Sequence, residues 1–340
     1  KLIVALVAGL FAFTSVNAGE MTVSGSMHVT YQSEVDDVTG NPLGMNTDLT
    51  FAGSTDTDFG TASFSLATDG TFLGESGADH TYSLATDLGT FSVANNGDAG
   101  NAVDDITPTA FEEANGSGSG TYAVDFGSGM DGSMSIAYAN GDIMGTGISV
   151  KYSYYPKLDG ATNNEKAASA ANNSATDSAE SINVGIPLAG LPIIGDSPLG
   201  AAKITLGYEN SDSRVTDAQP KEGGTVAVVM PVGPLSIGFQ KKAYQSVGTS
   251  AAEAQDAFFK DDILGVAFAI NDAAAISYNV IESAKHLHTT GEVEQETKAI
   301  NFAYTVGGLT LAFQDAKTSN AGYVATTDDD TRTLSIKTAF

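Results

Sequence analysis

The chain of 340 residues carries 15 basic and 41 acidic residues, a formal net charge of −26, and it contains no cysteine. Such an acidic surface repels nucleic acid and anionic lipid head groups, and a chain without thiols forms neither disulfides nor thiolate metal sites. We therefore expect no nucleic-acid partner and no covalent or thiolate support for the fold.

The first eighteen residues have the order of a secretory signal. Lys1 precedes the apolar run Leu2–Phe13, and Val16-Asn17-Ala18 supplies a small-residue cleavage site. The run is too short for a membrane-spanning helix. We expect residues 1–18 to be removed on export. The mature chain would then hold 14 basic and 41 acidic residues, and 14 − 41 = −27.

From Met21 onward, apolar and polar residues alternate in short stretches. Alternation with period two places the apolar side chains on one face of a β-strand. The apolar rows predict about sixteen strands. These rows are Met21–Tyr31, Leu49–Phe51, Ala62–Leu66, Tyr82–Leu84, Phe91–Val93, Met134–Tyr138, Ile148–Tyr154, Ile182–Ile186, Ile204–Tyr208, Val226–Met230, Leu235–Phe239, Leu264–Ile270, Ile276–Val280, Ile300–Val306, Leu309–Phe313 and Leu334–Phe340.

The opposite faces of these strands distinguish a membrane barrel from a soluble β-sandwich, which alternates too. They consist mostly of Ser, Thr, Gly, Ala, Asn and Gln, while charged residues gather in the connections. A barrel with lipid outside and water inside requires that pattern. The sequence therefore predicts an all-β fold over residues 19–340, a transmembrane antiparallel β-barrel of about 16 strands.

The predicted connections alternate between long and short, as in outer-membrane barrels, where long loops face outward and short turns face the periplasm. The long ones are Ser33–Met45, Asp69–Gly77, Asn96–Gly132, Pro156–Glu180, Ser211–Gly223, Ser246–Lys260, Ser283–Glu296 and Ser319–Asp330. The short ones are Thr55–Thr57, Thr86–Gly89, Gly141–Gly145, Gly190–Leu199, Gly233, Asn271–Ala273 and Gly307. We expect both ends of the barrel on the periplasmic side and loop 156–180 outside the cell. Thr121–Phe126 also alternates, but a strand there would make the count odd, so we place it inside the loop 96–132.

Four features carry a resemblance to a known family: the stretches "GEMTVSGSMHVTY", "LGTFSVANN" and "VDDITPTAFEEANG", and the terminal Phe340. They resemble bacterial trimeric porins, in particular porin-like proteins of marine alphaproteobacteria. The resemblance implies a homotrimer in the outer membrane of a Gram-negative bacterium, reached through the periplasm. It implies passive diffusion of small hydrophilic solutes and ions without a cofactor, and contact with outer-membrane lipids and lipopolysaccharide. It further implies that the outer-membrane assembly machinery reads Phe340.

In that family the long loop after the fifth strand folds into the lumen and narrows it. The matching loop, residues 96–132, has no Lys or Arg, and its constriction acids are Asp98, Asp104, Asp105, Glu112 and Glu113. Thr107 and Pro108 suit the cap and first residue of a helix, so a short helix is expected over Pro108–Ala114. Acidic groups lining a narrowing favour cations. An inert, solvated acidic surface loop is the alternative.

Basic residues along the expected lumen are few. Between Lys1 and Lys151 the chain has none, whereas the porins it resembles oppose the acidic loop with a basic cluster that lies partly on early strands. Alternation turns Lys151, Lys203, Lys242 and Lys337 toward the lumen. Lys337, beside the first strand, is best placed to face the loop, while the other three are as well explained by solubilising the rim. We predict a cation preference.

The sequence offers little for catalysis or metal binding. His286 and His288 with Glu292 and Glu294 are the best metal candidates, and His28 should point inward without a recognisable catalytic partner.

The acidic clusters Asp36–Asp37 and Asp328–Asp330 suit weak Ca²⁺ binding, although solvation is the usual role of such charges. We expect no enzyme, no specific metal site and no cofactor. The alternative function is a non-conducting outer-membrane barrel that serves as a structural or adhesin-type surface protein.

Overall fold

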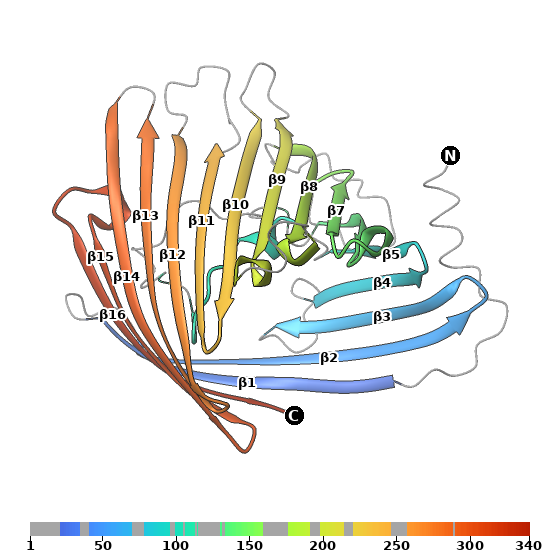
Figure 1. Cartoon of the computed structure of the whole chain (residues 1–340), viewed down its shortest axis with the longest axis horizontal. Coiled ribbons are helices and arrows are strands. Elements are labelled where there is room, and N and C mark those ends of the chain that lie inside the picture. Colours follow the sequence, from blue (N-terminus) through green and yellow to red (C-terminus); the bar gives the residue numbers. More distant parts are fainter. Residues whose placement is uncertain are drawn as a thin grey trace.

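The chain folds into a closed antiparallel β-barrel, described here from a computed structural model (Figure 1). Sixteen strands lie within the described residues; each pairs with its neighbours in chain order, and the first pairs with the last. A closed sheet leaves no strand edge unpaired, as a barrel in lipid requires. The predicted antiparallel barrel and its number of strands are confirmed.

The structure describes residues 21–34, 41–69, 78–95, 99–104, 106–112, 114, 130, 133–158, 176–190, 198–213, 220–245, 257–287 and 290–340. The predicted signal over residues 1–18 and the stretch Thr121–Phe126 lie outside them. Strand β5 nevertheless pairs directly with β6, so the closed sheet has no place for a further strand between the two.

The strands are β1 (Met21–Glu34), β2 (Leu43–Thr57), β3 (Gly60–Asp69), β4 (Ala78–Thr86), β5 (Gly89–Ala94), β6 (Ser135–Asn140), β7 (Ser149–Tyr155), β8 (Thr176–Pro187), β9 (Lys203–Ser213), β10 (Lys221–Val232), β11 (Leu235–Gln245), β12 (Ala257–Asn271), β13 (Ala274–Leu287), β14 (Thr290–Val306), β15 (Leu309–Ser319) and β16 (Asp328–Ala339). Short 3₁₀ turns are η1 (Asn101–Val103), η2 (Ile143–Gly145), η3 (Leu188–Gly190), η4 (Pro198–Ala201) and η5 (Ala321–Tyr323). None of the helical segments in these described residues is long and apolar enough to cross a membrane.

The last strand closes the barrel against the first, as predicted. The backbone N–H of Gly25 donates to the carbonyl of Phe340, and the N–H of Phe340 donates to the carbonyl of Gly25, both at 2.9 Å. Because Gly25 has no side chain, the ring of Phe340 lies 2.8 Å from the point where a Cβ would stand. Figure 1 shows β16 beside β1 at this seam.

The two faces of the sheet differ as the alternation predicts. On β14, Phe302 is 39% exposed on the outer face, whereas the neighbouring Asn301 is fully buried on the inner face. The same contrast holds along β9, where Leu206 is exposed and Glu209 is buried. The barrel therefore presents apolar side chains outward and polar side chains inward.

The outer apolar rows end in ion pairs near the long connections. Outward-facing pairs are Lys241–Asp262, Glu296–Lys298, Lys317–Asp330 and Asp315–Arg332. These charges lie on strands, not in loops, so the predicted long loop over Ser283–Glu296 is wrong. Strand β13 runs to Leu287 and β14 begins at Thr290, because alternation continues through the charged residues. By contrast, the connection between β8 and β9, residues 188–202, is longer than the predicted short connection Gly190–Leu199, and it contains η3 and η4.

Candidate functional site: the barrel interior

The described residues between Ala99 and Ala114 (99–104, 106–112 and 114), called the inner segment below, lie along the inner wall of the barrel from β8 to β15. At its start, the N–H of Ala99 donates to Ser181 Oγ at 3.1 Å, and Asn183 Nδ2 donates to the Ala99 carbonyl at 2.7 Å. Near its end, Ala110 N–H donates to Ser277 Oγ at 2.9 Å. All three wall residues belong to the inward rows. The inner segment thus crosses the interior beside at least half of the strands.

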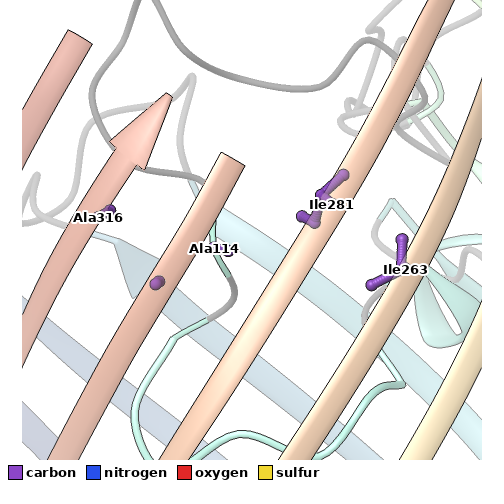
Figure 2. Packing of buried hydrophobic residues seen from close by; sticks show 5 residues of the cluster. Ala114, Ile263, Ile281 and Ala316 are labelled. Atoms are coloured by element: carbon purple, nitrogen blue, oxygen red, sulfur yellow. The ribbon is translucent and has the colours of Figure 1, made fainter. Parts of the chain in front are cut away.

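The far end of the inner segment is held by apolar packing. Ala114 is buried against Ile263, Ile281, Ala299 and Ala316, which point inward from β12 to β15 (Figure 2). Side chains as large as Ile263 and Ile281 are unusual on this face of small and polar residues, and here the inner segment covers them. Burying them removes apolar surface from the watery interior, at about 25 cal/mol per Å².

A row of inward amides holds the middle of the inner segment. Asn279 Nδ2 donates to the Pro108 carbonyl at 3.1 Å, and Gln314 Nε2 donates to the Glu112 carbonyl at 3.3 Å. Between them, Asn301 Nδ2 contacts Thr109 Oγ1 at 3.3 Å. The helix predicted over Pro108–Ala114 is absent from the described residues of this range. Its carbonyls bond to wall amides instead, which satisfies the backbone without a helical ladder.

One acid of the inner segment is neutralised by the wall. The carboxylate of Asp104 lies 2.7 Å from Lys242 Nζ, and both side chains are buried. Gln240 Nε2 donates to the carbonyls of Val103 and Asp104 at 2.8 and 3.0 Å. Lys242 faces inward, and it forms a buried anchor with Asp104. Neither presents a free charge to the lumen.

Glu112 lies on the inner segment and faces the closing seam of the barrel, where His28 and Lys337 are its charged neighbours. The surrounding wall removes water from its carboxyl group and raises its pKa, while positive charge at His28 and Lys337 lowers it; the net shift is upward. His28 and Lys337 are direct register partners on β1 and β16. Lys337 thus faces the inner segment. Asp98, Asp105 and Glu113 lie outside the described residues.

The early strands carry inward-facing acids that sequence reasoning did not single out. Asp48 and Asp56 on β2, and Asp79 on β4, share the inward rows with Ser and Thr residues. Asp48 accepts a hydrogen bond from Ser26 Oγ at 2.9 Å. No Lys or Arg lies on the described parts of β1 to β6. The acids were already visible in the alternation, since each sits two or four residues from an inward Ser or Thr.

Lys151 and Lys203 both face inward, and both are exposed. They line a cavity of about 360 Å³ beside the start of the inner segment. Within the described residues, neither has a carboxylate in ion-pair range.

The described residues bring together no group of three or more His, Asp or Glu side chains that could hold a metal ion. His286 lies on β13, not in a loop, and its ring is 5.9 Å from that of Phe258. In the cluster Asp328–Asp330, Asp330 pairs with Lys317 at 3.3 Å. Weak Ca²⁺ binding at the acidic clusters, and the absence of enzymatic activity, stay predictions.

Comparisons with known proteins identify the fold. No protein-family model matches the chain, and no curated protein matches it in sequence. Among solved structures, OmpT, an outer membrane protein of Vibrio cholerae, is 11% identical with a TM-score of 0.65, and the match covers 97% of this chain and 100% of OmpT. An anion-selective porin from Comamonas acidovorans is 14% identical with a TM-score of 0.61, covering 95% and 100% of the two chains.

The outer membrane channel DcaP of Acinetobacter baumannii is also similar, at 14% identity and a TM-score of 0.62, with 96% of this chain and 99% of DcaP covered. The barrel has the fold of outer-membrane porins. At such identities the likeness extends to the fold alone, so function must be argued from the residues of this chain. The resemblance to porins of marine alphaproteobacteria stays a prediction.

Proposed function

We propose that the protein is a porin-type channel in the outer membrane of a Gram-negative bacterium, through which small hydrophilic solutes and ions diffuse passively. The observation that carries the proposal is the closed barrel of 16 strands with an apolar outer face and a polar inner face. A barrel of this strand number leaves an aqueous passage. The inner segment narrows that passage without closing the sheet. The fold shared with solved porins supports the proposal.

The proposed porin function also includes an orientation in the membrane, an assembly route and an oligomeric state. The long connections face the outside of the cell and the short turns face the periplasm, through which the chain is exported. Phe340 serves the assembly machinery, and the outward ion pairs lie at the level of the lipopolysaccharide head groups. OmpT of Vibrio cholerae has also been solved in a trimer form, with a TM-score of 0.62 to this chain. That similarity supports a homotrimer.

The channel prefers cations. The Comamonas acidovorans porin is described as anion-selective although it has the same fold, so selectivity must come from charges in the lumen. Here the inward acids Asp48, Asp56 and Asp79 lie on strands of the β1 to β6 region, whose described residues include no Lys or Arg, and Glu112 adds a carboxylate on the inner segment. Fixed negative charge in a narrow pore attracts cations and repels anions.

The test is the reversal potential of the purified protein in a planar bilayer that separates two KCl concentrations. The wild-type protein should give the sign of a cation-preferring pore, and Glu112→Gln should move the reversal potential toward zero. Because the Debye length is about 8 Å at physiological ionic strength and shorter at higher salt, the preference should weaken as salt rises. Glu282→Gln is the matched control, since it removes the same charge from the outer face of β13. An anion-selective wild-type pore would contradict the proposal.

The raised pKa of Glu112 predicts a pH dependence of selectivity. Its raised pKa means that the carboxyl group takes up a proton at a higher pH than an ordinary glutamate, whose value is 4.5. As the pH falls, the cation preference should therefore decline in a first step above that value. Glu112→Gln should lack this step, which a measurement of the reversal potential against pH would show.

A further inference from the structure

Lys151 and Lys203 face inward, and among the described residues neither has a carboxylate partner. Lys221 and Lys242 also point inward, but each is buried and paired, with Glu209 at 3.0 Å and with Asp104 at 2.7 Å. Lys151 and Lys203 are exposed instead, and no described Asp or Glu lies within ion-pair range of either. A solvated ammonium that faces a cavity keeps its donors available for a ligand.

The two lysines belong to one cavity. Lys151 on β7 is the register partner of Asn183 on β8, and Lys203 on β9 is the partner of Pro187 on the same strand. They therefore approach the inner face of β8 from its two sides. The inner segment supplies the cover, with Val103 and Ile106 among the lining residues. The cavity, of about 360 Å³, lies near the lower end of the range usual for small-molecule sites.

The remaining lining is suited to an anion. Asn183, Thr205 and Ser149 add neutral polar groups, and no acidic residue occurs among the described residues that line the cavity. Gly185 leaves room for the lysine: a Cβ there would stand 2.9 Å from Lys203 Nζ and 2.5 Å from Ser149 Oγ. The ammonium of Lys203 thus occupies space that any side chain at position 185 would take.

We propose that this cavity, called the two-lysine site below, binds a small dianion, a phosphate or a dicarboxylate, on the inner wall of the barrel. Two ammonium groups from different strands offer charge-assisted hydrogen bonds to two acidic oxygens of one solute. The inference rests on the proposed function only because a solute must be able to reach the barrel interior. The two-lysine site would then be a dianion-binding site within a pore that otherwise prefers cations.

The experiment is equilibrium dialysis of the full mature chain in detergent at low ionic strength, with radiolabelled inorganic phosphate in one arm and succinate in the other. Saturable binding is expected in at least one arm, and the arm that binds assigns the ligand as phosphate or carboxylate. Lys151→Gln with Lys203→Gln should weaken binding by about tenfold or more, the loss expected when charge-assisted hydrogen bonds are removed. Gly185→Ala keeps both lysines but displaces Lys203, so it should weaken binding too.

The matched control is Lys241→Gln with Lys317→Gln. It removes two positive charges from exposed lysines on the outer face and should leave binding unchanged. No binding in either arm, or equal binding by wild type and the Lys151/Lys203 variant, would overturn the proposal. Dialysis does not depend on conductance. A barrel that conducts but does not bind would therefore contradict this inference alone, and a barrel that binds but does not conduct would contradict only the proposed function.

Discussion

Replacing Lys242 with methionine should destabilise the barrel by about 3–5 kcal/mol, because it leaves the Asp104 carboxylate buried without the lysine charge. The two groups are 2.7 Å apart, and the Lys242 side chain is fully buried. The cost should appear as a lower free energy of unfolding by urea in lipid vesicles. Single-channel current should also become noisier, since the inner segment loses its central attachment while the Gln240 hydrogen bonds remain.

Two controls distinguish the buried anchor from a general effect of charge. Lys241→Met alters the next residue, whose ammonium is exposed and pairs with Asp262 on the outer face, so it should cost no more than about 1 kcal/mol. Adding Asp104→Asn to Lys242→Met should restore much of the stability, because no buried charge is then left alone. Equal unfolding free energies for the Lys242 and Lys241 variants would show that the ion pair does not anchor the inner segment.

The second large effect concerns the two faces of the sheet. Phe268 is 42% exposed on the outer face of β12, and Ala269 is exposed on the inner face of the same strand. Phe268→Arg should lower the free energy of unfolding in lipid vesicles by up to about 2–4 kcal/mol, because the charge meets hydrocarbon. Ala269→Arg places the same side chain in the watery interior. It should leave stability nearly unchanged and reduce the cation preference.

Each outcome is informative about orientation. If Ala269→Arg were the more destabilising of the two, the assignment of inner and outer faces would be inverted. The assignment of inner and outer faces follows from alternation in every strand. An inverted assignment would therefore also contradict the placement of Glu112 and of the two-lysine site in the barrel interior.

The sequence alone predicts the barrel well, because period-two alternation recurs in all sixteen strands. The side chains of the polar rows are also smaller and less often charged than those on the exterior of a soluble protein. The sequence predicts strand ends poorly where strands become charged. Residues 282–287 and 290–298 look like parts of a loop by composition, yet they belong to strands β13 and β14, which pair with each other. Where a strand extends beyond its apolar row, its outer face needs no apolar side chains. Composition there does not distinguish a strand from a loop.

The interior is harder to predict, since its contacts join residues far apart in the chain. Asp104 reads as a pore-lining acid until Lys242, 138 residues away, is found beside it. Pro108 reads as the start of a helix, but wall amides such as Asn279 bind its carbonyl. No local pattern encodes either pairing. What alternation does predict is the row itself: Lys151, Lys203, Lys242 and Lys337 all point inward, although only the fold shows which of them are paired.

The measurement that tests the central claim most directly is single-channel recording of the purified protein in a planar bilayer in symmetric KCl. A channel of this architecture should produce discrete, stepwise increases in current as individual molecules insert. The folded state of the same preparation is checked by heat-modifiable mobility on a gel. Protein that inserts and migrates as a folded barrel but never conducts would contradict the channel and favour a structural or adhesin-type surface protein.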